Sequence, residues 1–300
     1  MGGFHHITVL RDEVIATIRS APAGVIVDCT LGGGGHSEAL LEARPDCRVI
    51  GIDRDPDALA AARERLARFG DRFEAVEGSY SQIREILEAR GVEAVSAVVA
   101  DIGVSSHQID TAHRGFSFQK DGPLDMRMGP SVGASAADYV NSVERQELAD
   151  ALRDYGDVRS AWKIAGAIVD GRPFSTTLQL ADVVSEAAGG RRGRVHPATR
   201  TFQAIRIVVN DELGELRTLL DAIPHLLTPG GVASIISFHS AEDRMVKRRF
   251  FELAGVDAEK DAFGNPLAQP FGRLLKRGAV KGGGDNVRAR SARLRSLERM

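Results

Sequence analysis

The chain has few cysteines, no long apolar run and no N-terminal signal pattern, and each absence excludes a class of protein. Cysteine occurs only twice in 300 residues, as Cys29 and Cys47, with no Cys-x-x-Cys pair and no Cys/His cluster, so we expect neither a disulfide framework nor a structural metal. No apolar run approaches the roughly 20 residues that cross a bilayer, and the first residues lack a basic-then-apolar signal. We therefore expect a soluble, cytoplasmic protein with no membrane partner.

A strong net charge is also absent, because the formal charge is only −2, so the chain as a whole is not predicted to bind a polyanion. Local charge differs from this average. Residues 273–300 hold nine Lys or Arg against two acids, and residues 189–206 hold five Arg and no acid. These two segments favour a local anionic partner, and a solvated surface is the alternative.

What the sequence does contain is a regular alternation of strand and helix patterns over its first hundred residues. Four apolar runs, at 25–29, 48–52, 73–77 and 94–100, alternate with helical patterns at 10–20, 37–44, 57–69 and 80–90. This order predicts an α/β fold with a mostly parallel sheet covered on both faces.

The alternation then stops and returns later in the chain. Residues 102–133 read as a loop, and helical patterns follow at 135–140, 143–154, 158–170 and 177–188, with Trp162 expected in their core. A helix at 203–227, a strand at 232–238, a helix at 241–254, a loop at 258–285 and a last strand at 286–298 complete the pattern. We expect a core of residues 1–110 and 203–300, and a loop and helical insertion at 111–202 for substrate recognition.

Acidic residues and a glycine loop mark the ends of three predicted strands. Asp28 ends the first strand and is followed by four glycines at 32–35, while Asp53 and Asp101 end two others. Ligands of open α/β sheets bind at the carboxyl ends of the strands, and glycines let the backbone approach them. The sequence therefore predicts a nucleoside-cofactor site there.

Two cofactor classes share these features, NAD and S-adenosylmethionine. Asp28 would repel a pyrophosphate but tolerate a cationic ligand, His36 follows the glycines where a dinucleotide fold wants a small residue, and Asp101 can face an amine. These details favour the methyl donor. The alternative is that Asp28 and Asp101 only cap turns or helices.

At this point the residues resemble the 16S ribosomal RNA (cytosine-N4) methyltransferase family, RsmH or MraW. The resemblance runs from His6 to about Arg295 and is most specific in the middle motifs. The matching segments are Asp28–Ser37, Ile52–Pro56, Asp101–Ser106, Arg114–Phe118, Asp121–Met128, His196–Arg206, Ser237–Arg244 and Asn286–Arg295. The departures from the family pattern are His107 for Pro, Tyr80 for Phe, Ala241 for Leu and Val287 for Pro.

The resemblance implies a class I, Rossmann-like S-adenosylmethionine-dependent methyltransferase core with an inserted all-helical domain. It implies methyl transfer to the exocyclic N4 amine of a decoding-region cytidine in 16S rRNA of the small ribosomal subunit. It leaves the oligomeric state open, a homodimer included. The implied cofactor contacts are Gly34, Gly35, His36, Asp53, Tyr80, Asp101 and Gln108.

Asp101 is the candidate catalytic residue. The cytosine amine is a poor nucleophile, and an acceptor on one of its N–H groups would localise the lone pair and receive the proton. The alternative is that Asp101 only holds the cofactor. Ring-carbon methylation would need a cysteine nucleophile, and neither cysteine lies at the acceptor position, so amine methylation is preferred.

Several residues are candidates for contact with RNA. Phe116 and Phe118 could stack on an extruded base or anchor their loop to the core, and Arg127 could pair with Asp125. Arg200 and Arg206 could contact phosphate, and His239 could contact the substrate or be a hydrogen-bonded structural histidine. Lys247, Arg248 and Arg249 form a basic run on a helix.

Two other functions compete with methyl transfer. A nicotinamide-dependent oxidoreductase predicts a Gly-x-Gly-x-x-Gly spacing, whereas the glycines here are contiguous. A noncatalytic RNA-binding factor of ribosome assembly predicts RNA affinity without methyl transfer.

Overall fold

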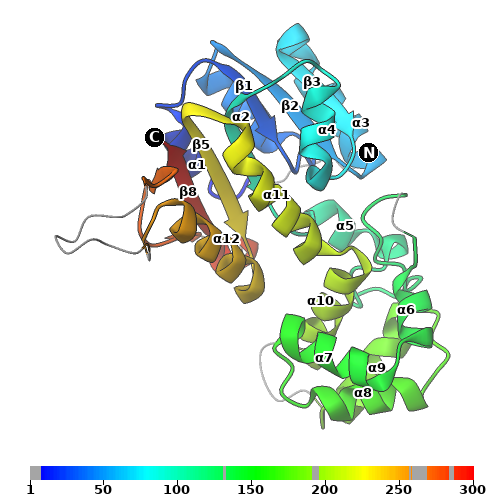
Figure 1. The fold of residues 1–300 in the computed structure, drawn as a ribbon. Coiled ribbons are helices and arrows are strands. Elements are labelled where there is room, and N and C mark those ends of the chain that lie inside the picture. The colour runs from blue at the N-terminus through cyan, green and yellow to red at the C-terminus, as the bar shows by residue number, and fades with distance from the viewer. Residues whose placement is uncertain (1–7, 131–132, 191–195, 257, 259–268, 284–286) are drawn as a thin grey trace. The chain divides into compact units, whose positions relative to one another are not determined.

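The chain folds as two compact units in the computed structural model (Figure 1), which describes residues 8–130, 133–190, 196–256, 258, 269–283 and 287–300. The first unit is Met1–Gly103 with Gly214–Met300, and the second is Val104–Leu213. The expected boundaries, 110/111 and 202/203, both lie inside the second unit. This unit includes the whole helix at 197–209 because that helix buries Phe202 and Ile205 in the second unit's core.

An eight-stranded mixed sheet forms the centre of the first unit, in the order β3-β2-β1-β4-β5-β8-β6, with β7 also paired to β8. The first five strands are parallel, as predicted, and β8 runs antiparallel to its neighbours. The strands are β1 Gly24–Asp28, β2 Cys47–Asp53, β3 Phe73–Glu77, β4 Val95–Asp101, β5 Leu227–Ser237, β6 Gly272–Leu274, β7 Val280–Lys281 and β8 Arg293–Arg299.

Helices cover both faces of this sheet because successive strand residues point to opposite sides. Val27 and Ile50 belong to one buried cluster, whereas Ile26 and Val49, their neighbours in the chain, belong to another. The helical segments of this part are α1 Arg11–Ile18, α2 Gly35–Ala43, α3 Pro56–Leu66, η1 Ala67–Arg72, η2 Tyr80–Gln82, α4 Ile83–Glu88, α11 Glu212–Leu226, α12 Ser240–Leu253 and η4 Val287–Ser291.

The second unit is helical and has its own apolar core. The four helices predicted between 135 and 188 are present as α6 to α9, with shifts of a few residues at their ends. Its segments are α5 Ser106–Asp110, η3 Ala112–Arg114, α6 Ala136–Ser142, α7 Arg145–Gly156, α8 Ala161–Asp170, α9 Thr177–Ala187 and α10 Pro197–Val209.

Five local predictions are wrong. The last strand, expected at 286–298, is η4 Val287–Ser291 followed by β8 Arg293–Arg299, and residue 286 lies outside the described residues. The helix expected at 203–227 is two helices, because Asp211 has φ 47° and interrupts the helical backbone between α10 and α11. The predicted loop at 102–133 contains α5, and the loop at 258–285 contains β6 and β7, although 259–268 and 284–285 lie outside the described residues. Trp162 is 53% exposed and packs against the Arg145 guanidinium rather than in the core.

Candidate cofactor and active site

Three acidic strand ends lie on one edge of the first unit's sheet. β1 lies between β2 and β4, and Asp28 is in register with Gly51 of β2 and Val99 of β4. From β1 the chain builds β2 and β3 on one side and then returns to start β4 on the other. This reversal of strand order is where open α/β sheets bind ligands.

The glycine loop has a backbone that other residues would adopt only with strain. Gly32 and Gly34 have φ of 50° and 80°. A Cβ on Gly34 would lie 3.0 Å from Leu66, and one on Gly35 would collide with the Thr8 hydroxyl. The loop therefore needs glycine where it turns into α2.

Asp53, at the end of β2, is fixed by backbone donors. Gly32 N donates to Asp53 Oδ2 at 2.7 Å, and Asp55 N donates to Oδ1 at 2.9 Å. Each carboxylate oxygen can accept a second hydrogen bond, so the group can still accept from two ribose hydroxyls. Glu77 of β3 is the register partner of Asp53, and Tyr80 follows it by three residues. Tyr80 is half-buried and packs on the apolar core.

Burial raises the pKa of Asp53 to about 6, and this predicts a pH dependence of cofactor binding. Only the ionised carboxylate accepts from both ribose hydroxyls, so protonation as the pH falls through about 6 removes an acceptor. We expect the Kd for S-adenosylmethionine to rise about tenfold from pH 7 to pH 5, as a simple one-site titration requires. Calorimetric titration checks this, and Asp53→Asn should bind weakly with a flat profile. A sloping profile in that variant would assign the effect to another group, such as His36.

Asp28 holds the two ends of the glycine loop together. It is fully buried, accepts from Ser37 Oγ at 2.7 Å and accepts from Thr30 N at 3.2 Å. Burial raises its pKa. These hydrogen bonds fit the alternative that Asp28 caps a turn and the start of a helix, and through them Asp28 positions the glycine loop.

Asp101, at the end of β4, differs from Asp28 in what its side chain contacts. Its backbone N–H donates to Thr30 Oγ1 at 2.6 Å, and its Oδ2 lies 3.6 Å from His36 Nε2. Among the described residues, neither Asp101 Oδ1 nor His36 Nε2 has a hydrogen-bond partner, although both atoms are buried. Buried polar atoms without partners are costly, so these two atoms are available to a polar ligand.

His36 is tied electrostatically to both carboxylates. Burial lowers its pKa, but Asp101 and Asp28 outweigh this effect, so the pKa is raised above its usual value. The imidazolium is stabilised by a site that is acidic overall. An acidic site of this kind suits a cationic ligand, which agrees with the preference for a sulfonium donor over a pyrophosphate.

Gln108 belongs to the second unit and has a structural partner there. Its Oε1 accepts from Ser105 N at 3.0 Å, and its own N–H donates to Ser105 Oγ at 3.1 Å, which forms a capping box at the start of α5. Helix α5 lies in a segment expected to be a loop, although Ser-x-x-Gln is a helix-capping signal. A cofactor contact by Gln108 stays a prediction.

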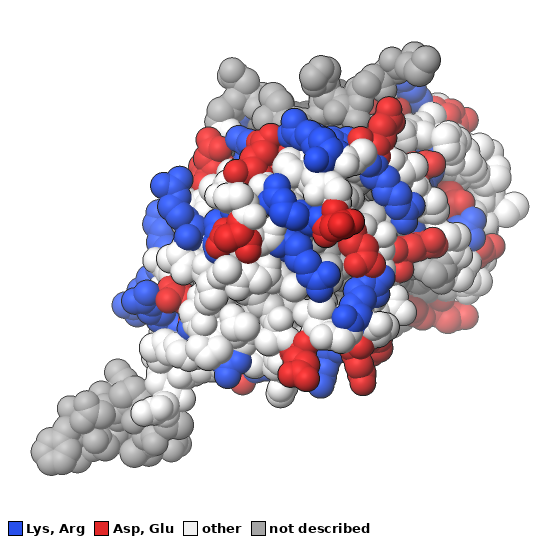
Figure 2. All heavy atoms as spheres, turned by 90° about the horizontal axis from the view of Figure 1, so that it is seen from above, with Lys and Arg blue, Asp and Glu red and all other residues white. Residues whose placement is uncertain are grey.

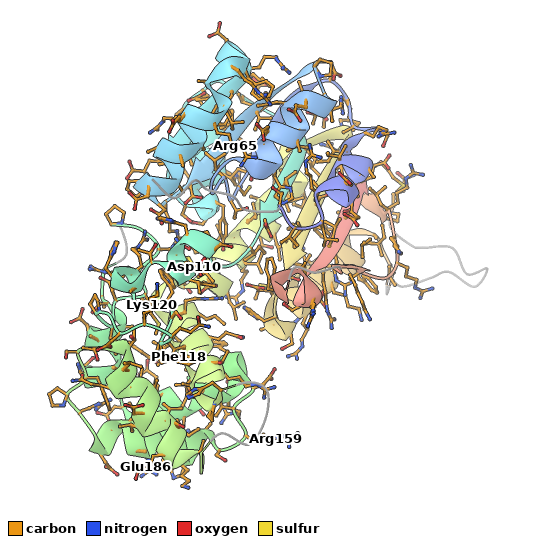
Figure 3. The ribbon with its side chains drawn as sticks, turned by 180° about the vertical axis from the view of Figure 1, so that it is seen from behind. Arg65, Asp110, Phe118, Lys120, Arg159 and Glu186 are labelled. Carbon is orange, nitrogen blue, oxygen red and sulfur yellow. The ribbon has the colours of Figure 1, made fainter. Side chains whose placement is uncertain are left out.

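Phe116 and Phe118 pack against the core of the second unit. The Phe118 ring centre lies 4.9 Å from that of Phe202, edge to face, and 4.7 Å from that of His196 (Figure 3 labels Phe118). Both rings remain half-buried. This geometry fits the alternative that they anchor their loop, and base stacking stays a prediction.

We expect Phe118→Ala to lower the free energy of unfolding by about 2 kcal/mol, because it removes a partly buried ring from an aromatic cluster. Phe118→Leu should restore most of the loss, since it returns apolar volume. Thermal melts and the Michaelis constant for RNA are to be measured together. A raised Michaelis constant with an unchanged Tm would show that the ring stacks on a base instead.

The predicted arginine contacts are occupied within the second unit. Arg127 forms the expected bidentate pair with Asp125, at 2.8 Å for both bonds, and lowers the pKa of that carboxyl. Arg200 is exposed and donates to Asp157 O at 2.9 Å. Arg206 pairs with buried Glu212 at 2.6 and 2.8 Å. Contact of Arg127, Arg200 and Arg206 with RNA stays a prediction.

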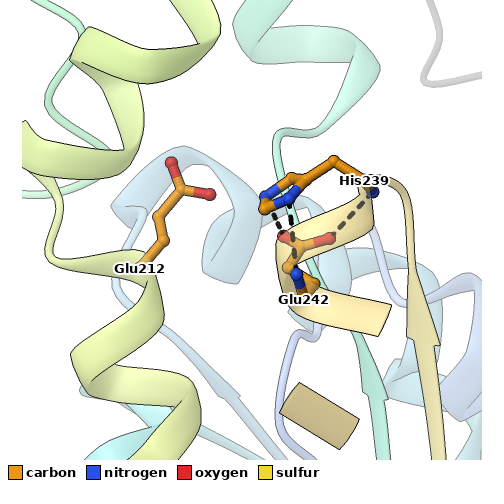
Figure 4. A group of neighbouring side chains, drawn as sticks. All are labelled: Glu212, His239 and Glu242. Carbon is orange, nitrogen blue, oxygen red and sulfur yellow. Dashed lines mark hydrogen bonds and ion pairs between the residues drawn. The ribbon is translucent and has the colours of Figure 1, made fainter. Parts of the chain in front are cut away.

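His239 begins α12 and pairs with Glu242 on the same helix (Figure 4). Its Nε2 lies 3.0 Å from Glu242 Oε1, its Nδ1 accepts from Glu242 N, and Glu242 Oε2 accepts from Phe238 N at 2.9 Å. These contacts match the structural-histidine alternative. Contact between His239 and the substrate stays a prediction.

The sequence reasoning missed the residues that support the site. Thr30, Ser37 and Glu242 hold the glycine loop and the start of α12 through side-chain hydrogen bonds. Ser37 and Glu242 gave a usable signal, since each lies in the first turn of a helix next to a strand end. The role of Thr30 depends on β1 and β4 being neighbours.

The mixed sheet with the order β3-β2-β1-β4-β5-β8-β6 and an antiparallel β8, together with the glycine loop and the acidic strand ends, is a class I methyltransferase fold. A family model described as the MraW methylase family matches residues 3–300. The chain belongs to this family.

Relatives of the full length support this assignment. The chain is 48% identical over 310 residues to ribosomal RNA small subunit methyltransferase H of Geobacter sulfurreducens, with 99% of each chain covered. It is 48% identical over 314 residues to the protein of the same name from a Methylobacterium species, covering 100% of this chain and 92% of the other. A solved rRNA methylase from Streptococcus thermophilus is 11% identical, with a TM-score of 0.43 and 98% and 99% coverage, a likeness too low to add to the argument. No helix in the described ranges is long and apolar enough to cross a membrane.

Proposed function

We propose that this methylase transfers a methyl group from S-adenosylmethionine to the exocyclic N4 amine of a decoding-region cytidine in 16S rRNA of the small ribosomal subunit. The observation that carries the chemical part is Asp101, a carboxylate at a strand end with one buried oxygen that lacks a partner. The names of the relatives support the RNA class, and the motif resemblance supports the base and the amine.

The residues present fit the cofactor. The glycine loop turns at two positive-φ positions directly before α2, and Asp53 can accept from ribose hydroxyls. Gly34, Gly35, His36, Asp53 and Tyr80 would hold it. When bound, S-adenosylmethionine supplies a methyl group that already carries its leaving group, so alignment matters more than activation.

Asp101 is assigned the acceptor role toward the base. Its carboxylate takes a hydrogen bond from one N–H of the cytosine amine, which localises the nitrogen lone pair for attack. The proton lost from nitrogen after the N–C bond forms passes to the carboxylate and then to solvent. The His36 Nε2 atom lies 3.6 Å from Asp101 Oδ2 and orients the carboxylate.

Nucleoside mass spectrometry tests the function directly. Small-subunit RNA from cells lacking this gene should have lost N4-methylcytidine, and the purified protein with S-adenosylmethionine should restore it. Restoration by the Asp101→Asn variant at the wild-type rate would remove the assigned role of Asp101. RNA binding without any methyl transfer would instead support the noncatalytic assembly factor, and NADH binding would support the oxidoreductase.

A further inference from the structure

The basic C-terminal segment and α12 form one surface in the first unit. Figure 1 shows α12 beside β8, and the two elements are joined by ion pairs. Asp243, in the first turn of α12, accepts from Arg293 at 2.9 Å and from Arg295 at 2.7 Å. We define the basic face as Arg244, Lys247 and Arg248 of α12, Lys281 of β7 and Arg293 of β8.

The α12 residues of the basic face share one exposed stripe. Val246 and Phe250 are buried with the other inward positions of the helix. Arg244, Lys247 and Arg248 are exposed and lie one turn apart on the opposite side. Lys247 rests over the Phe251 ring at 5.3 Å, which holds its ammonium group along the stripe.

The strand residues of the basic face place two cations directly opposite each other. Lys281 of β7 is the register partner of Arg293 of β8. Like charges in directly opposed positions destabilise an antiparallel pair. Asp243 offsets the repulsion between Lys281 and Arg293 only in part, because one carboxylate serves both Arg293 and Arg295. The Arg295 side chain is 11% exposed, whereas the Arg293 side chain is 50% exposed and remains accessible to solvent. A bound anion would remove the remaining repulsion.

Acidic partners are missing for four of the five basic-face residues, although Asp243 pairs with Arg293 and the protein supplies acidic partners elsewhere. In the described part of the chain, no ion pair involves Arg244, Lys247, Arg248 or Lys281. Arg249, on the neighbouring side of α12, pairs with Asp221 and Glu252. On the face seen in Figure 2, basic and acidic side chains are intermingled. Arg65 of the first unit likewise pairs with Glu38.

We infer that the basic face binds the phosphate backbone of the RNA substrate and so docks the small subunit on the methyltransferase core. The inference rests on the proposed function and extends it to a specific surface. Exposed cations without internal partners release counterions from the RNA when they neutralise its phosphates. The unit as a whole does not need excess positive charge, because a local cluster is enough to orient a polyanion.

The test compares two triple variants of the full-length chain. Arg244→Gln/Lys247→Gln/Arg248→Gln removes three charges from the basic face. Arg19→Gln/Arg48→Gln/Arg84→Gln removes the same charge from three exposed arginines elsewhere in the first unit. Methyl transfer to small subunits from cells lacking the gene, and sedimentation binding to them, are measured across a range of monovalent salt concentrations.

We expect the basic-face variant to raise KM for the small subunit about tenfold and to lower the slope of log affinity against log salt by about two to three. Its kcat, its Kd for S-adenosylmethionine and its Tm should stay at wild-type values, and the control triple should match wild type throughout. Arg244→Lys/Arg248→Lys should keep the wild-type slope, since phosphate needs the charge rather than the guanidinium.

Three outcomes would overturn the inference. The first is an unchanged salt slope in the basic-face variant, and the second is an equal loss of affinity in the control triple. The third is that wild-type protein binds phosphatidylserine vesicles more tightly than small subunits and that the basic-face variant loses this vesicle binding. The proposed function can fail independently. If wild-type protein transfers no methyl group to small-subunit RNA, that function is wrong, while sedimentation binding still tests the basic face.

Discussion

Replacing Asp101 by Asn is expected to lower kcat about a thousandfold, the middle of the range for losing a positioned proton acceptor. The amide is nearly the same size, so the end of β4 keeps its shape and the Asp101 backbone keeps its bond to Thr30. What changes is the charge next to His36 and the ability to take the amine proton. Single-turnover transfer of tritiated methyl to small subunits measures the chemical step.

The same variant separates the two roles considered for Asp101. If the carboxylate acts on the amine, the Kd for S-adenosylmethionine should change less than about threefold while kcat falls, a pattern expected for an interaction made in the transition state. If the Kd collapses together with turnover, the carboxylate holds the cofactor and its chemical role is wrong. Asp71→Asn, an exposed aspartate of the same unit, is the control and should behave as wild type.

Replacing Asp53 by Ala is expected to weaken S-adenosylmethionine binding about a hundredfold. Hydrogen bonds to a charged acceptor contribute about 1.5–3 kcal/mol each, and losing two of them amounts to at least two powers of ten in Kd. The variant also removes the acceptor for Gly32 N and Asp55 N, so the glycine loop loses its tie to β2. Calorimetric titration with the donor measures the effect.

The kinetic signature of Asp53→Ala should be the reverse of that of Asp101→Asn. At saturating donor, kcat should recover to within a few-fold of wild type, because the role proposed for Asp53 is contact with the cofactor and not with the amine. Asp71→Ala is the matched control. A variant that binds the donor with wild-type affinity would show that the end of β2 does not hold the ribose, and the cofactor site assigned here would be wrong.

Much of the first unit could be predicted from the sequence because its signals are local. The strand at 73–77 was located to the residue, since an alternating apolar run bounded by turns specifies a strand without reference to the rest of the chain. The acidic strand ends and the glycine loop were likewise visible as short patterns. Parallel pairing then followed from the alternation with helices, so the shared edge of Asp28, Asp53 and Asp101 was predictable too.

The errors lie where tertiary contacts override local pattern. Residues 203–227 carry continuous helical periodicity, yet the chain turns at Asp211, where Asn210 donates to Met126 O at 2.8 Å. Trp162 is exposed because the α8 residues that face the core include Ile164 and Ile168 but not Trp162, and Arg145 of another helix covers one face of its ring at 4.3 Å. Neither partner is close in sequence, so neither choice could be made from a local window.

The sequence by itself determined the order of strands and helices, the glycine loop and the three acidic strand ends, because each depends on residues that are neighbours in the chain. Only the tertiary structure decided which carboxylate keeps an unpartnered oxygen. The Asp28 carboxylate accepts a hydrogen bond from Ser37, whereas the Asp101 carboxylate faces His36, which lies 65 positions earlier in the chain. The structure also decided that Asp243 joins α12 to β8 and that Lys281 opposes Arg293. Partners of this kind are set by packing and strand register, which bring distant residues within bonding distance and which no single segment encodes.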